Sequence, residues 1–151
     1  MTPPRHRHSP PPGRARAEGG QVTAFVVIVT AALLLVAGLV YDGGLLLAAH
    51  RRAISEAEAA ARAGAQALDE DTYRATGAVR LDPAQAARLA DTYLAATGHA
   101  HTVRLAGPDR VEVSVTITQP LRLLAAAGLG SRTVTGRATA HAVPGVQAPG
   151  A

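Results

Sequence analysis

The chain has 151 residues, contains no cysteine and carries a formal net charge of +4. The absence of cysteine excludes disulfide bonds, thiolate metal sites and a cysteine nucleophile. The N-terminal tail contributes +3 of the net charge, because Arg5, Arg7, Arg14 and Arg16 stand there against Glu18. Since the remainder is close to neutral, the basic character of the chain does not indicate a nucleic-acid-binding face, and no nucleic-acid partner is predicted.

Residues 1–21 form a tail that is rich in proline and arginine and has no apolar periodicity. Such a composition buries too little apolar surface to fold, so we expect a disordered basic tail. His6 and His8 alternate within it, but two histidines on a flexible segment define no metal site.

Residues 22–40 form a hydrophobic run without a charged side chain. A helix of this length spans about 28 Å, close to the ~30 Å hydrocarbon core of a bilayer. The run is longer than the apolar part of a signal peptide, and no small-x-small cleavage site follows it. A buried helix of a soluble protein is the other alternative. We predict a transmembrane helix over residues 22–41, with Tyr41 and Asp42 at the membrane interface.

The arginines near the two ends of this run predict its orientation. Four arginines precede the run, whereas Arg51, Arg52 and Arg62 follow it. Because positive charge is retained on the cytoplasmic side, we expect a cytoplasmic N-terminus and an extracytoplasmic C-terminal domain. The sequence therefore predicts a single-pass protein of the cell membrane.

An alanine-rich segment over residues 50–70 predicts a helix that continues from the membrane to about Leu68. Small or apolar residues recur along it at heptad-like spacing. Such a stripe lets another element approach closely, and two interpretations remain open. The stripe packs either against the chain's own domain or against copies of the chain and related subunits. Its members are Ile54, Ala57, Ala61, Gly64 and Leu68.

The remaining sequence predicts one more helix and a hairpin. Asp82 as N-cap and Pro83 at the first helical position indicate a helix start, and Gly98 indicates its end. From residue 100 the apolar period changes to two, which predicts strands over residues 101–105 and 110–118. Four apolar residues should form the buried face of the second strand: Val111, Val113, Val115 and Ile117.

The C-terminal part predicts a short helical turn over residues 121–127 and a third, weaker strand over residues 132–143. The expected fold class is α+β: an N-terminal transmembrane helix extending into a long Ala-rich helix, a second helix, then a small three-stranded antiparallel sheet. The extracytoplasmic domain would occupy residues 42–143, followed by a loose C-terminus over residues 144–151.

Common catalytic signatures do not occur in the sequence. It has no G-x-x-x-x-G-K-[ST], H-E-x-x-H or G-x-S-x-G motif. His99, His101 and His141 could meet from neighbouring strands and bind a metal ion, although exposed strand-edge histidines are the commoner case. We predict no enzymatic activity, no catalytic residue, no cofactor and no metal site.

Three stretches of the N-terminal half are distinctive: Gly20-Gln-Val-Thr-Ala-Phe-Val-Val, Gly38-Leu-Val-Tyr-Asp-Gly-Gly and Arg52-Ala-Ile-Ser-Glu-Ala-Glu-Ala-Ala-Ala-Arg-Ala-Gly-Ala. They resemble the TadE/TadG-like proteins of the tight-adherence (Flp, type IVb-like) pilus assembly system, and actinobacterial members most closely. In that family a hydrophobic helix ends at an Asp-Gly step and runs into an Ala-rich helix.

The resemblance implies a non-enzymatic, membrane-anchored component of a Tad/Flp-type pilus or secretion apparatus. Such a component is a minor pilin, a pseudopilin or an assembly factor, and it acts by helix–helix association. The implied partners are the membrane, other pilus or secretion-system subunits, and further copies of the chain. The alternative function is a membrane-tethered extracytoplasmic binding module that is not linked to pili.

The resemblance also implies a candidate prepilin-type cleavage between Gly20 and Gln21. Prepilin-like members carry glutamate at the fifth position after the cleavage, whereas this chain has Phe25 there. In a low-dielectric bundle that carboxylate neutralises the free N-terminus of a neighbouring subunit. Its absence favours an uncleaved, TadG-like anchor.

Overall fold

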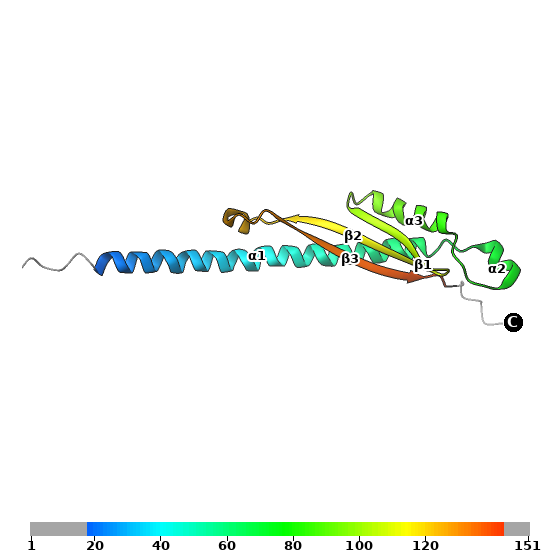
Figure 1. The fold of residues 1–151 in the computed structure, drawn as a ribbon, viewed down its shortest axis with the longest axis horizontal. Coiled ribbons are helices and arrows are strands. Elements are labelled where there is room, and N and C mark those ends of the chain that lie inside the picture. Colours follow the sequence, from blue (N-terminus) through cyan, green and yellow to red (C-terminus); the bar gives the residue numbers. More distant parts are fainter. Residues whose placement is uncertain (1–17, 144–151) are drawn as a thin grey trace, which may run out of the picture. The chain divides into compact units, whose positions relative to one another are not determined.

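The computed structural model describes residues 18–143, and the side chains from residue 22 onward. Residues 1–17 and 144–151, with most of the predicted tail and the predicted loose C-terminus, lie outside the described residues. Figure 1 shows the elements in chain order: α1 (Glu18–Gly64), α2 (Glu70–Thr76), α3 (Pro83–Ala95), β1 (Ala100–Gly107), β2 (Arg110–Pro120), the short 3-10 helix η1 (Leu124–Ala127) and β3 (Ser131–His141). The predicted α+β fold class is confirmed.

Helix α1 is 47 residues long, and the boundary between the two compact units of the chain lies within it, between Ala37 and Gly38. Within the described residues it is the one helix that is long and apolar enough to cross a membrane. The large apolar side chains of its hydrophobic run are exposed, as at Phe25 (67%), Leu34 (68%) and Val40 (72%). Exposed apolar side chains in such number are typical of a surface that contacts lipid or another protein.

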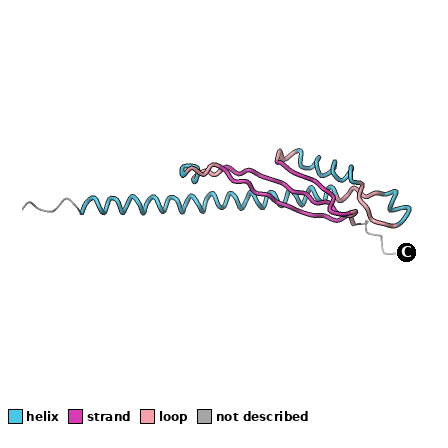
Figure 2. Tube along the Cα trace, in the orientation of Figure 1, coloured by secondary structure: helices cyan, strands magenta, loops and turns pink. Residues whose placement is uncertain are grey.

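The sheet has the strand order β1-β2-β3, and both pairs are antiparallel (Figure 2). Side chains alternate along β2, where Val111, Val113 and Val115 are fully buried. The opposite face is polar, and Thr116 on β2 contacts Thr135 on β3 through their hydroxyl groups. The predicted hairpin and its buried face are therefore confirmed, as is the third strand.

The buried face of the sheet packs against the C-terminal part of α1. A Cβ atom placed on Gly136 of β3 would lie 2.3 Å from the backbone N of Ile54 and 2.4 Å from the carbonyl C of Ala53. The helix backbone therefore touches the strand backbone directly. Ala57 and Ala61 are fully buried in the same core.

Helix α3 completes this core and starts as the sequence predicts. Asp82 caps it by accepting hydrogen bonds from the backbone N–H groups of Ala84 and Gln85. Ala86, Ala90 and Leu94 are fully buried, whereas Leu89 (37%) and Tyr93 (46%) are partly exposed. The chain turns after this helix at Gly98, whose φ is 68°.

The predicted end of the long helix at about Leu68 is wrong, because α1 ends at Gly64. Gly64 packs tightly, since a Cβ atom there would lie 3.2 Å from Cγ1 of Val111. Leu68 instead forms an isolated antiparallel bridge with Leu81. Asp69 then caps α2 by accepting hydrogen bonds from the backbone N–H and the hydroxyl of Thr72. These hydrogen bonds hold the pKa of the Asp69 carboxyl below its usual value.

We predict that Gly136→Ala destabilises the domain, because its methyl group would overlap the backbone of α1. Overpacking of this kind costs about 1–3 kcal/mol. Thermal unfolding of the full chain in detergent micelles measures the effect. Gly130→Ala is the matched control, since a Cβ atom there meets nothing within 4 Å. Equal unfolding temperatures for the two variants would contradict the close contact between β3 and α1.

Candidate functional site

The carboxylate of Asp42 joins α1 to the loop between β2 and β3. One of its oxygens, Oδ1, accepts a hydrogen bond from the backbone N–H of Arg122 at 2.9 Å. The other, Oδ2, accepts from Leu123 at 3.0 Å and from Leu124 at 2.7 Å. The Asp42 side chain is fully buried by these contacts.

These three N–H groups need an acceptor because they precede or begin η1. The first N–H groups of a helix have no partner within the helix. Leu123 stands at the N-cap position of η1 and provides no side-chain hydrogen bond there. Asp42 provides the missing acceptor from a position 80 residues or more away in the sequence. Its negative charge also suits the N-terminal end of a helical turn.

The same loop touches α1 one turn earlier, at Gly38. A Cβ atom on Gly38 would lie 3.3 Å from Cβ of Leu123 and 3.4 Å from Cδ2 of Leu124. Glycine therefore allows the loop to approach the helix closely. We name residues 121–130 the β2–β3 loop. Asp42 and Gly38 together fix this loop beside the end of the hydrophobic run.

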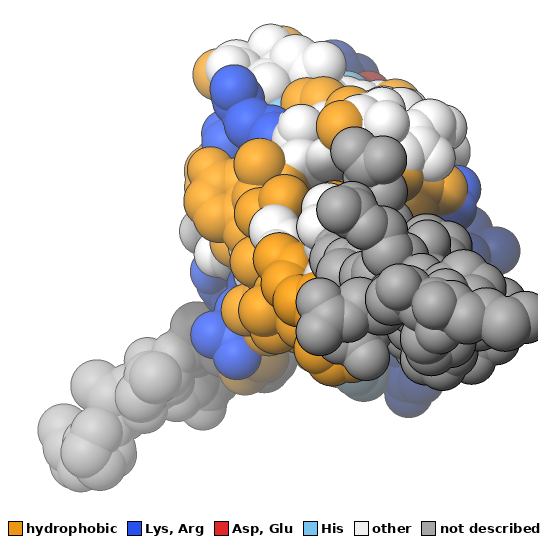
Figure 3. All heavy atoms as spheres, turned by 90° about the vertical axis from the view of Figure 1, so that its left-hand side faces the viewer, with side chains coloured by type: hydrophobic (Ala, Val, Ile, Leu, Met, Phe, Trp, Pro, Cys, Tyr) orange, Lys and Arg blue, Asp and Glu red, His pale blue; other side chains and the backbone are white. Residues whose placement is uncertain are grey.

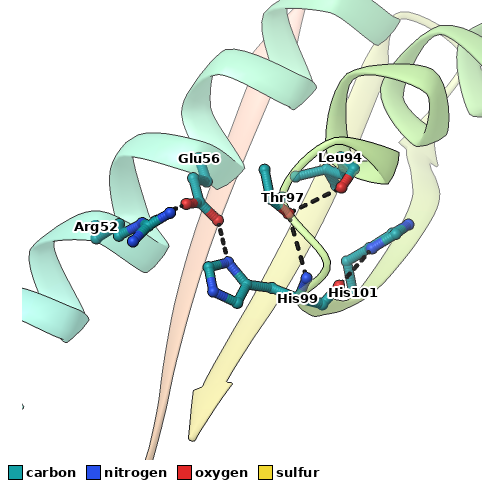
Figure 4. A network of polar contacts seen from close by, with 6 residues as sticks. All are labelled: Arg52, Glu56, Leu94, Thr97, His99 and His101. Carbon is teal, nitrogen blue, oxygen red and sulfur yellow. Dashed lines mark hydrogen bonds and ion pairs between the residues drawn. The ribbon is translucent and has the colours of Figure 1, made fainter. Parts of the chain in front are cut away.

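A second polar cluster joins α1 to the start of the sheet (Figure 4). The Glu56 carboxylate contacts the Nε of Arg52 at 2.8 Å and the Nδ1 of His99 at 2.7 Å. Burial by itself raises the pKa of the Glu56 carboxyl, but the hydrogen bonds from His99 and Arg52 outweigh it. The pKa of Glu56 therefore lies below its usual value, and the carboxylate is the favoured form.

The three histidines of the conceivable metal site each lie beside a different carboxylate. His99 pairs with Glu56, His101 with Asp91 at 3.4 Å, and His141 with Asp109 at 3.6 Å. Among residues 18–143, no group of three histidine, aspartate or glutamate side chains is placed to hold a metal ion.

The predicted association stripe is largely used inside the chain. Ala57, Ala61 and Gly64 are buried, and Ile54 and Leu68 are half-buried. Packing within the chain, the first of the two interpretations, is therefore what the structure shows for its central residues. A single chain does not test association between copies, which stays a prediction.

The other predicted site residues are placed as follows. Tyr41 is 50% exposed on α1, whereas Asp42 is buried by the loop and does not face solvent. Gly20 and Gln21 lie in the first turn of α1, and their side chains are outside the described ones. Sequence reasoning missed the contact between Asp42 and the loop, because no local pattern connects positions so far apart in the chain.

Residues 20–67 match the model of the family described as "Putative Flp pilus-assembly TadE/G-like". The matched segment comprises nearly all of α1, including Gly38 and Asp42. The match shows a likeness to this pilus-assembly family over about a third of the chain. No curated protein and no solved structure matches the chain. Closeness to actinobacterial members stays a prediction.

We predict that Asp42→Ala loosens the β2–β3 loop, because three N–H groups lose their charged acceptor. Amide hydrogen exchange at Arg122, Leu123 and Leu124 should accelerate by about tenfold or more. Asp42→Asn should have a smaller effect, since its amide keeps one acceptor oxygen. Asp71→Ala is the control, because the Asp71 side chain is 99% exposed. Unchanged exchange in Asp42→Ala would show that the cap does not hold the loop.

We also predict an acid-dependent loss of stability that depends on Glu56. The pKa of the Glu56 carboxyl is lower in the folded chain than in the unfolded chain, where it is about 4.3. The Glu56 carboxylate therefore stabilises the fold above the unfolded pKa, and this stabilisation is lost as the pH falls through the folded pKa. Glu56→Gln should therefore unfold at a lower temperature than the wild type near neutral pH, and this difference should shrink in acid. The matched control is Glu58→Gln, whose carboxylate is 53% exposed. A difference that stays constant with pH would contradict the ion pairing.

Proposed function

We propose that this chain is a membrane-anchored, non-enzymatic component of a Tad-type pilus or secretion apparatus. In this proposal residues 22–40 of α1 cross the membrane, and the α+β domain lies outside the cytoplasm. The component would be a minor pilin, a pseudopilin or an assembly factor. Since the chain has Phe25 where prepilin-like proteins carry glutamate, an uncleaved anchor is the form that we favour.

The observation that carries the proposal is that two properties occur in the same part of α1. The family match covers residues 20–67, and the hydrophobic run within that segment exposes its large apolar side chains. In the most apolar stretch of this helix, only 6% of the residues are buried. The core helix of a soluble protein would be mostly covered, so this exposure supports a membrane-spanning role.

The two parts of α1 differ in burial, and this difference indicates what each part contacts. The part of the helix near Ala53, Ala57 and Ala61 is covered by the chain's own sheet. The surface left for helix–helix association is therefore the hydrophobic run. Its small residues Ala31, Ala32 and Ala37 would let a second helix approach closely in a bilayer.

The proposal is tested in a host that normally forms pili: the gene is deleted, and variants of the chain are then expressed in the deletion strain. Leu33→Arg combined with Leu34→Arg should abolish membrane retention and pili, because each arginine costs about 2.5–3.5 kcal/mol at the centre of an inserted helix. The matched control replaces both residues with alanine and should restore pili. Membrane fractionation and electron microscopy of filaments provide the two readouts.

The two leucines are well suited to this test because they are 65% and 68% exposed. On a water-exposed helix, arginine would be tolerated there and pili would form. Restoration of pili by the arginine variant would therefore refute the membrane anchor. Normal pili in the strain without the gene would refute the role in pilus assembly, and would favour the tethered binding module.

A further inference from the structure

The β2–β3 loop exposes apolar side chains although it is tied to α1 on its inner side. Leu123 is 51% exposed and Leu129 is 39% exposed. Ala125, Ala126 and Ala127 are exposed between them. Figure 3 shows exposed hydrophobic side chains with arginine side chains beside them. Within the loop the only charged residue is Arg122, so its outer surface is apolar.

Two contacts fix the position of the β2–β3 loop along the axis of α1. Gly38, which touches Leu123 and Leu124, belongs to the hydrophobic run of residues 22–40. Asp42, which binds the loop N–H groups, stands two residues beyond that run. Two helical residues rise about 3 Å, so the loop lies beside the last turn of the hydrophobic run.

We propose that the β2–β3 loop enters the lipid bilayer and forms a second membrane contact beside the helix. This proposal rests on the proposed membrane anchor, because it is the anchor that brings Gly38 to the lipid. Leu123, Leu129 and the three alanines then meet the region where the headgroups give way to the acyl chains.

The charged side chains at the ends of the β2–β3 loop and the hydrogen bonds of its backbone both favour contact with lipid. Arg122 and Arg132 are exposed at the two ends of the loop, where they can contact the phosphate groups of anionic lipids. Irregular backbone is unfavourable in lipid unless its polar groups are paired. Here Asp42 pairs three of the loop N–H groups, and the N–H of Leu121 is paired with the carbonyl of Gly130 at 3.0 Å.

A depth measurement on the full chain tests this contact. The chain has no cysteine, so a single introduced cysteine is labelled uniquely. Ala126→Cys reports on the loop, Leu33→Cys on the middle of the hydrophobic run, and Thr139→Cys on the exposed polar face of the sheet. Each variant is labelled with nitrobenzoxadiazole and reconstituted into vesicles of phosphatidylethanolamine and phosphatidylglycerol that carry spin-labelled lipids. Protease resistance before labelling verifies that each variant is folded.

The expected result is a blue-shifted Ala126 label that shallow lipid spin labels quench, together with a Leu33 label that deep ones quench. The Thr139 label should stay solvent-exposed and unquenched. An Ala126 label that behaves like the Thr139 label overturns the loop contact and leaves the anchor intact. An Ala126 label that is shielded from water but not quenched by lipid shows a second copy on the loop, which also overturns it. An unquenched Leu33 label refutes the anchor and the loop contact together.

Discussion

The direct contact between the backbones of α1 and β3 is the constraint on which the domain depends. At Gly136 no side chain separates the strand from Ala53 and Ile54 of the helix. The neighbouring core positions on the helix are alanines, among them Ala57 and Ala61. Such small residues bury little apolar area each, so their stabilising effect comes from dense packing. The valines of β2 supply the bulk that the helix lacks, and a larger residue on either surface would separate the two elements.

Asp42 provides the second attachment, and it works by a different physical effect. A buried carboxylate is unfavourable unless hydrogen bonds replace its water. Three backbone N–H groups do so here, and they are groups that the 3-10 helix leaves without an acceptor. The carboxylate therefore gains donors that replace its water, and the three N–H groups gain an acceptor. The contact also explains why glycine occurs at position 38, since the loop that Asp42 holds needs space one helical turn earlier.

Local patterns predict α1, α3, the short turn and the three strands, but neither helix α2 nor the contacts between the elements. The period-two alternation of β2 and the cap at Asp82 were read correctly because each depends on neighbouring residues. The end of α1 was misplaced because the heptad-like spacing continues to Leu68, whereas a tertiary contact, the bridge to Leu81, takes that residue out of the helix. Asp42 was predicted at the membrane interface without a partner in the chain, since no residue near it in the sequence indicates a partner 80 residues later. The pairing of Glu56 with His99 was missed for the same reason.

An aspartate at the end of a hydrophobic run has to satisfy two opposing demands. A membrane helix needs a polar residue where it leaves the lipid, yet a charged group without partners is costly so close to the hydrocarbon. A carboxylate that is exposed to water would also be solvated, but it would not attach the β2–β3 loop to the helix. By binding the N–H groups of Arg122, Leu123 and Leu124, the carboxylate meets both demands. Together with the close approach of Leu123 to Gly38, the same contact fixes the β2–β3 loop against this part of α1.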